Sequence, residues 1–200
     1  VLRGTDDAIW ETALAAPGTG RLFAVGRVDQ DQTRLRAWDW TAAGYVPLMT
    51  HVDVEAQSPV GAVCSEDGEL VVTASKDGKR RVEGAQVWAV ENGGLRLRGT
   101  LQSGALKIPA AQIVVSEALE DGQEHRIACV HDDRVLRVWD ENCNLLHTMA
   151  DLPTPRAPRF QPGSHWLEVW CRDSTVRVFD DQGRSRATLA AGTLASGQLH

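Results

Sequence analysis

The sequence lacks every short motif that would point directly to an enzyme. It has no G-x-G-x-x-G after a strand, no G-x-x-x-x-G-K-[S/T], no G-x-S-x-G and no H-E-x-x-H. Nothing therefore indicates a dinucleotide site, a phosphate-binding loop, a serine nucleophile or a helical zinc site. We expect no enzyme activity, no catalytic residue and no cofactor.

Cysteine and metal-binding patterns are also scarce. The chain has four cysteines, none of them in a C-x-x-C pair: Cys64, Cys129, Cys143 and Cys171. Most lie in apolar, strand-like runs, where a free cysteine behaves as a small buried hydrophobic residue. We expect reduced thiols in a cytoplasmic protein, with a disulfide or metal role as the alternative. The six histidines are scattered, with no H-x-H or H-x-x-x-H spacing, so we expect no metal ligands among them.

Long apolar runs and a basic excess are absent as well. No run approaches the roughly 18 to 20 residues of a membrane helix, and no signal peptide is visible. The net charge of -6 argues against general nucleic-acid binding. Nearly all of the 21 basic residues are arginine, which favours a GC-rich coding background and a bacterial source. Because the chain begins at Val1 instead of Met, we expect it to be a piece of a longer protein.

The chain instead contains one pattern repeated four times, each copy ending in an apolar strand with an aromatic anchor. The anchors are Trp38, Trp88, Trp139 and Phe179, spaced 50, 51 and 40 residues apart. A repeat of about 40 to 50 residues with an aromatic-ended strand is typical of a propeller blade. The repeat therefore predicts the fold more clearly than the function.

Each copy contains four short apolar runs divided by clusters of Gly, Asp and Asn. Such spacing indicates strands joined by hairpins, and four antiparallel strands make one blade. No stretch keeps a 3.6-residue period with helix caps, so we expect almost no helix. The predicted fold class is all-β. The predicted blades cover about 8–50, 57–102, 108–152 and 157–191, followed by a tail at 192–200.

On these residues the chain resembles the WD-repeat family of β-propellers. The Trp-Asp pair of the family is matched by Trp38-Asp39 and Trp139-Asp140, and in altered form by Phe179-Asp180. The hairpin Asp of the family, six residues before the aromatic anchor, is matched by Asp133 and Asp173. The second copy has lost the Asp, with Ala89 after Trp88. The resemblance covers essentially the whole chain.

The resemblance implies a structural role for these anchor residues. In the family, the hairpin Asp, a loop His, a strand Ser or Thr and the Trp form a buried hydrogen-bond network. Here Gly4-Thr5 and Gly99-Thr100 stand where the family has Gly-His. We therefore expect an incomplete network, with blades held mainly by aromatic and aliphatic burial.

The number of copies implies that other blades exist elsewhere. Propellers of this family usually have about seven blades, and this chain has four. Residues 1–5 resemble the outer strand of a blade that would lie before Val1. We expect the remaining blades on the same precursor or on another chain, as part of a ring of about seven or more.

Basic residues suggest where a partner could bind. A long hairpin in the second copy and the loops between copies carry Lys76, Lys79, Arg80, Arg81, Lys107, Arg156 and Arg159. Arginine clusters favour carboxylate or phosphate groups through forked hydrogen bonds. The alternative for the hairpin is a solvated turn with no partner. The Pro-rich segment 151–162 is expected to stiffen the crossing into the fourth copy.

Three functions remain open from the sequence. The favoured one is a non-catalytic protein-protein interaction scaffold, one portion of a split or cleaved propeller. The alternative is a sensor or regulatory propeller at the C-terminus of a bacterial multidomain signalling or defence protein with an NTPase, kinase or protease-like effector. The third is an enzyme with a metal, held by turn carboxylates, in the central channel. No membrane partner is expected.

Overall fold

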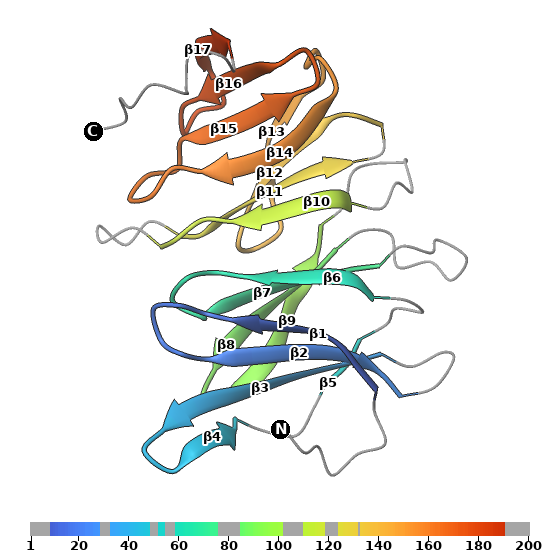
Figure 1. Cartoon of the computed structure of the whole chain (residues 1–200), viewed down its shortest axis with the longest axis vertical. Helices are drawn as coiled ribbons and strands as arrows, with labels where there is room; N and C mark the ends of the chain where they lie inside the picture. Colours follow the sequence, from blue (N-terminus) through green and yellow to red (C-terminus); the bar gives the residue numbers. More distant parts are fainter. Residues whose placement is uncertain are drawn as a thin grey trace. The chain divides into compact units, whose positions relative to one another are not determined.

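A computed structural model describes residues 9–28, 33–48, 52–54, 59–75, 85–101, 110–118, 124–131 and 133–190. All regular elements of this part of the chain are strands, and they form four antiparallel sheets (Figure 1). The predicted all-β class is confirmed. The described residues include no helix long and apolar enough to cross a membrane. Residues 1–5, expected to be an outer strand, and the predicted tail lie outside this part.

The chain divides into two compact units, Val1–Pro109 and Ala110–His200, with two sheets in each. In the first unit, the first sheet contains β1 (Ile9–Ala15), β2 (Leu22–Arg27), β3 (Thr33–Thr41), β4 (Gly44–Pro47) and β5 (Val52–Val54). The second sheet contains β6 (Pro59–Cys64), β7 (Leu70–Ser75), β8 (Gln86–Glu91) and β9 (Gly94–Thr100).

The second unit has the same organisation. Its third sheet contains β10 (Ala110–Val115), β11 (Arg126–His131), β12 (Leu136–Asp140) and β13 (Leu145–Met149). Its fourth sheet contains β14 (Pro155–Phe160), β15 (Leu167–Cys171), β16 (Thr175–Phe179) and β17 (Ser185–Ala190). Apart from β5, strands follow one another across each sheet in chain order, so hairpins make all the neighbouring connections.

The outer strand of the first sheet is not the single fourth strand expected at the end of the copy at 8–50. It is split into β4, which pairs with the end of β3, and β5, which pairs with the start of β3. Pro47 ends β4 because proline has no N–H to donate to a ladder. The next residue, Leu48, still donates its N–H to the carbonyl of Ala37 at 3.0 Å. The first sheet therefore has five strands instead of four.

Within each unit the two sheets pack face to face. Successive side chains point to opposite faces of a strand, and one apolar face of the earlier sheet covers one face of the later sheet. We call these the forward face of the earlier sheet and the backward face of the later one. The first core joins Phe23, Val25 and Leu35 of the first sheet to Val71 and Trp88 of the second.

The second core repeats this arrangement between the third and fourth sheets. Its forward-face residues are Ala128, Val130, Leu136 and Val138, and its backward-face residues are Leu167, Val169, Cys171 and Phe179. Full burial of a Val, Leu or Phe side chain contributes about 1.5 to 3 kcal/mol. Stacked apolar faces therefore stabilise each unit.

The aromatic anchors lie on the third strand of each sheet. Trp38, Trp88, Trp139 and Phe179 are all buried. The indole N–H of Trp88 donates to Thr73 Oγ1 at 3.1 Å, a buried bond between two strands of one sheet. The Arg36 guanidinium lies 5.4 Å from the centre of the Trp38 ring. Trp88 and Phe179 lie in the cores between the two sheets of their units, so burial of these two rings joins the paired sheets.

The hairpin aspartates close the turn before the third strand. Asp133 Oδ1 accepts the N–H of Val135 at 3.0 Å, and Asp173 Oδ1 accepts the N–H of Thr175 at 3.1 Å. An aspartate that accepts a bond two residues on is typical of a tight turn. Asp133 also accepts a bond from Arg137 at 2.7 Å. These contacts give both residues a role in shaping hairpins.

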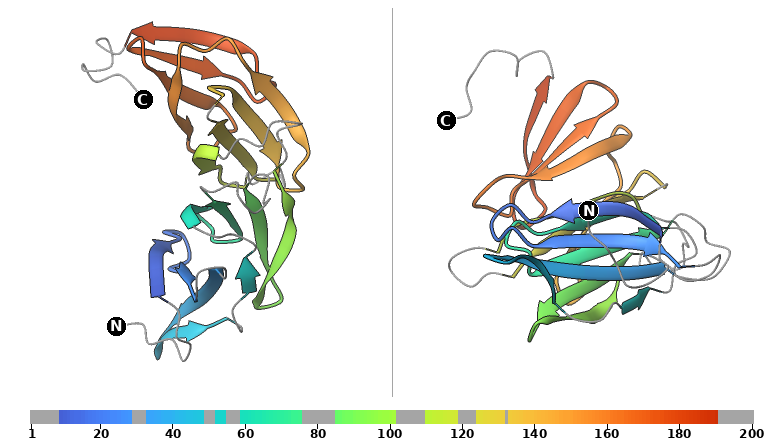
Figure 2. Two further views of the ribbon diagram at one scale, coloured as in Figure 1. Left: turned by 90° about the vertical axis from the view of Figure 1, so that its right-hand side faces the viewer. Right: turned by 60° about the horizontal axis from the view of Figure 1, so that its bottom comes forward.

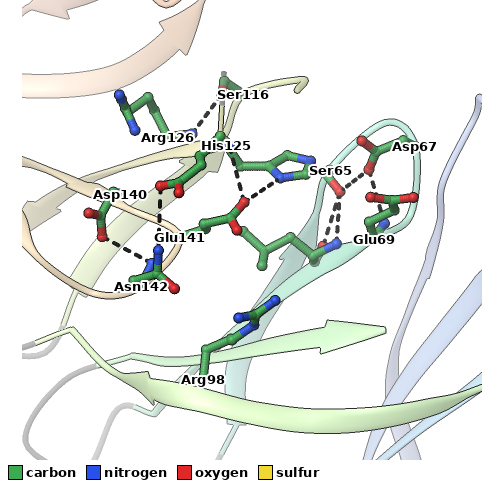
Figure 3. Close-up of polar contacts among 12 residues, drawn as sticks. Ser65, Asp67, Glu69, Arg98, Ser116, His125, Arg126, Asp140, Glu141 and Asn142 are labelled. Carbon is green, nitrogen blue, oxygen red and sulfur yellow. Dashed lines mark hydrogen bonds and ion pairs between the residues drawn. The ribbon is translucent and has the colours of Figure 1, made fainter. Parts of the chain in front are cut away.

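Asp140 and Asp180 clamp the turn after the third strand. Asp140 Oδ1 accepts the N–H group of Asn142 at 3.0 Å (Figure 3). It also accepts the N–H group of Asn144 at 2.8 Å. Asp180 Oδ1 likewise accepts the N–H groups of Gln182 at 3.0 Å and Arg184 at 2.8 Å. In the first sheet the corresponding Asp39 instead pairs with Arg21 Nε at 2.6 Å.

Candidate interaction surface

The third and fourth sheets can be aligned position by position through their ladders. Ile127 lies opposite Trp139 in the third sheet, and Leu167 lies opposite Phe179 in the fourth. Both pairs join the second strand to the aromatic anchor of the third strand. These pairs set the equivalence of all other positions on the two sheets.

This alignment identifies which fourth-sheet residues occupy the forward face. Six forward-face positions of the third sheet are apolar: Val114, Ala128, Val130, Leu136, Val138 and Met149. Their fourth-sheet equivalents, in the same order, are Arg159, Glu168, Trp170, Val176, Val178 and Leu189. We call these six residues, together with Trp166, the fourth-sheet face.

The fourth-sheet face exposes large apolar side chains. Trp166 is 40% exposed, Trp170 41% and Leu189 36%. Val130, the third-sheet equivalent of Trp170, is only 4% exposed and lies in the core with the fourth sheet. Figure 2 shows the four strands of this sheet, in orange to red, side by side. Grouped exposed apolar side chains mark interaction sites more often than isolated ones.

Charged groups lie both within and beside this surface, and Glu168 falls between Trp166 and Trp170, two residues from each. Arg159 lies directly opposite Glu168 in the ladder. Glu168 Oε1 accepts a bond from Gln161 Nε2 at 2.9 Å. Asp180 directly follows β16, two residues after Val178. It accepts bonds from Arg184 Nε at 3.0 Å and Arg186 Nε at 2.8 Å. The surface therefore combines exposed tryptophans with charged groups.

Asp180 stays ionised at neutral pH. Burial of its carboxylate favours the protonated form, but hydrogen bonds to the charged form outweigh that effect. They come from the Arg184 backbone, the Arg186 and Arg184 side chains and the Gln182 backbone, and they lower the pKa of Asp180 to about 2. A fixed negative charge flanked by two arginines therefore lies beside this surface.

Only some of the residues predicted to bind a partner can be placed. Lys76, Lys79, Arg80, Arg81 and Lys107 lie outside the described residues. Arg156 and Arg159 are exposed, as a binding role requires, but both lie in β14.

Placing Arg156 and Arg159 in loops between the repeat units was therefore wrong. β14 begins at Pro155, a position where the missing proline N–H breaks no ladder, so the strand starts earlier than expected. Arg156 lies in the register shift between Pro155 and Ala157. The structure brings Arg159 onto the fourth-sheet face.

Two histidines share a position that their scattered numbering conceals. His125 and His165 each precede, by two residues, the second-strand position that faces an aromatic anchor, and both are buried. His125 Nδ1 lies 3.1 Å from Glu141 Oε2 (Figure 3). Loop lengths differ between the copies, so only the ladder register relates the two residues.

The cysteine thiols are held in their protonated form by their surroundings. Burial raises the pKa of the Cys129 thiol, and burial and Asp140 raise that of Cys143 to about 11. A thiol with a raised pKa is a poor nucleophile at neutral pH. All four cysteines are free. Across the described ranges, no group of three or more His, Cys, Asp and Glu residues could hold a metal ion.

The fold and this surface together define an all-β protein of repeated antiparallel sheets with an exposed apolar face. No protein-family model matches the chain, and no curated protein is significantly similar to it in sequence. Among solved structures, it is similar to a protein from Lactobacillus plantarum, with a TM-score of 0.57 and 16% sequence identity. That match covers 88% of this chain and 53% of the other, so this chain spans about half the length of its neighbour. At this identity the similarity concerns the fold alone.

Proposed function

We propose that the chain is a non-catalytic protein-protein interaction scaffold whose sheets are blades of a WD-type β-propeller. The fourth-sheet face carries this proposal. It occupies the positions that the third sheet buries against a neighbouring sheet, yet it leaves two tryptophans and a leucine exposed. Further blades, on the same precursor or on another chain, are the partner that this face fits.

The two exposed tryptophans would contribute a substantial part of the energy of binding at this face. A tryptophan buries up to about 250 Å², so covering the exposed two-fifths of one ring removes about 100 Å² from water. At about 25 cal/mol per Å², that burial is worth about 2.5 kcal/mol for each tryptophan. Trp166 and Trp170 together then offer about 5 kcal/mol before the entropy lost on association.

Protein capture tests the proposal. The immobilised chain is exposed to an extract of its source organism, and bound proteins are quantified by mass spectrometry. We expect Trp170→Asp to lose the bound protein because a charge at the centre of the face would be buried without a partner. Leu97→Asp is the matched control, since it changes a large exposed residue of the second sheet. Equal capture by wild type and Trp170→Asp, or none by either, would contradict the proposal.

A further inference from the structure

The first sheet exposes an aromatic pair on its backward face. Trp40 is 61% exposed and Tyr45 41%, and their ring centres lie 4.9 Å apart in an edge-to-face arrangement. The two residues are ladder partners on β3 and β4. Trp40 lies two residues after Trp38, on the side of β3 opposite the forward-face residues Leu35 and Ala37.

The positions of Trp40 and Tyr45 have equivalents in the second sheet that are covered by another sheet. Val90 lies two residues after Trp88 and pairs with Leu95, as Trp40 follows Trp38 and pairs with Tyr45. Val90 and Leu95 both pack against the core formed with the forward face of the first sheet. Trp40 and Tyr45 therefore occupy positions whose equivalents in the second sheet contact the forward face of another sheet.

We propose that the fourth-sheet face of one copy binds the backward face of the first sheet of a second copy. This inference rests on the proposed function, because it names the occupant of the same face. Both internal interfaces join a forward face to a backward face. One chain exposes a forward face on its fourth sheet and a backward face on its first sheet, and both carry aromatic residues. Two copies therefore supply both halves of a head-to-tail contact.

The internal interfaces also indicate which strands meet. In the first unit, β6 contacts both β1 and β2, and β9 contacts β3, so the first strand of the later sheet lies on the first two strands of the earlier sheet, and its outer strand lies on the third. By the same rule, β1 of one copy lies on β14 and β15 of the next, and β4 lies on β16. That arrangement brings β4, which carries Tyr45, to the fourth-sheet face.

Sedimentation of the purified chain tests this contact. We expect the average mass to rise above 21.8 kDa as the concentration increases. Trp170→Asp and Trp40→Asp should each raise the apparent dissociation constant at least about tenfold, because aromatic residues dominate such interfaces. Tyr45→Asp is a second variant of the first-sheet surface, and Leu97→Asp should associate like wild type. Unchanged far-ultraviolet circular dichroism confirms that each variant is folded.

Mixing the variants tests the head-to-tail geometry. Trp170→Asp keeps an intact backward face and Trp40→Asp keeps an intact forward face, so an equal mixture can form one good contact. We expect a two-chain species with an affinity within about threefold of the wild-type contact, and no larger species, since both other faces carry a charge. A mixture that remains monomeric would overturn the inference, and so would either variant that associates alone as strongly as wild type, since that would mean that like faces pair.

Other outcomes separate the two proposals. A chain that is monomeric at all concentrations, yet captures a different protein through Trp170, overturns the second-copy contact and leaves the scaffold function standing. A chain that neither associates nor captures a partner overturns both. Association that neither Trp170→Asp nor Trp40→Asp weakens also overturns the inference.

Discussion

Gly183 in the turn between β16 and β17 provides a sharp test of the packing inside the second unit. Its φ of 71° lies in the left-handed region. A Cβ added there would lie 2.8 Å from His147 Cγ and 3.1 Å from His147 Cβ. These atoms are close to the backbone of β13, so the ring has little freedom to move away. Gly183→Ala should therefore strain the backbone and displace the histidine.

The expected cost has two parts. A non-glycine residue in the left-handed region costs about 1 to 2 kcal/mol. Moving the ring also breaks the contact between His147 Nε2 and the Asp181 carbonyl, which are 3.1 Å apart. Loss of such a bond costs about 0.5 to 1.5 kcal/mol. We expect Gly183→Ala to lower the free energy of unfolding by about 1.5 to 3.5 kcal/mol, a large part of the 5 to 15 kcal/mol typical of a domain.

Gly163 is the matched control. Its φ is 66°, but an added Cβ would meet no described atom within 4 Å. Gly163→Ala should therefore cost only the backbone part, about 1 to 2 kcal/mol. Urea unfolding followed by circular dichroism measures both variants, and His147→Ala in the Gly183→Ala background should recover part of the difference. Equal costs for Gly163→Ala and Gly183→Ala would refute the predicted contact with His147.

Two further predictions concern buried polar groups. Thr73→Val should cost about 1 to 3 kcal/mol because it leaves the Trp88 indole N–H buried without its acceptor. The double variant Thr73→Val and Trp88→Phe should lose less free energy of unfolding than the two single variants lose together. Fully additive losses in urea unfolding would contradict this. Because its folded pKa of about 2 lies below the ordinary 3.8, Asp180 contributes stability above about pH 4 that is lost as the pH falls towards 2. Asp180→Asn should remove that contribution, so unfolding experiments that show the same wild-type-to-variant difference at pH 3 and pH 7 would contradict it.

The arrangement of strands follows largely from local sequence. Short apolar runs ending at Asp, Asn and Gly turns specify where strands stop, and the aromatic anchors mark the third strand of each sheet. Asp133 and Asp173 act within two residues of themselves, so their turns depend on neighbouring residues alone. Local chemistry of this kind is visible in a sequence.

The interaction surface could not be found in the same way. Trp170 is recognised as an exposed interface position only because the ladders make it equivalent to the buried Val130. The anchors of the third and fourth copies are 40 residues apart, whereas the other successive anchors are 50 or 51 residues apart. Unequal loops shift the numbering, so equivalent positions are recognised only after pairing is known. His125 and His165 were missed for the same reason. The start of β14 was missed because three nearby prolines suggest a crossing segment instead of a strand.

The divided outer strand of the first sheet has a consequence for aggregation. An exposed strand edge can recruit other chains through unpaired backbone groups, and proteins commonly limit this with short strands and proline. Here β4 has four residues and β5 has three, with Pro47 at the break. Neither piece is long enough to template an extended ladder. This edge of the first sheet is therefore protected from indiscriminate backbone pairing, and its contacts with other chains depend on the identity of its side chains.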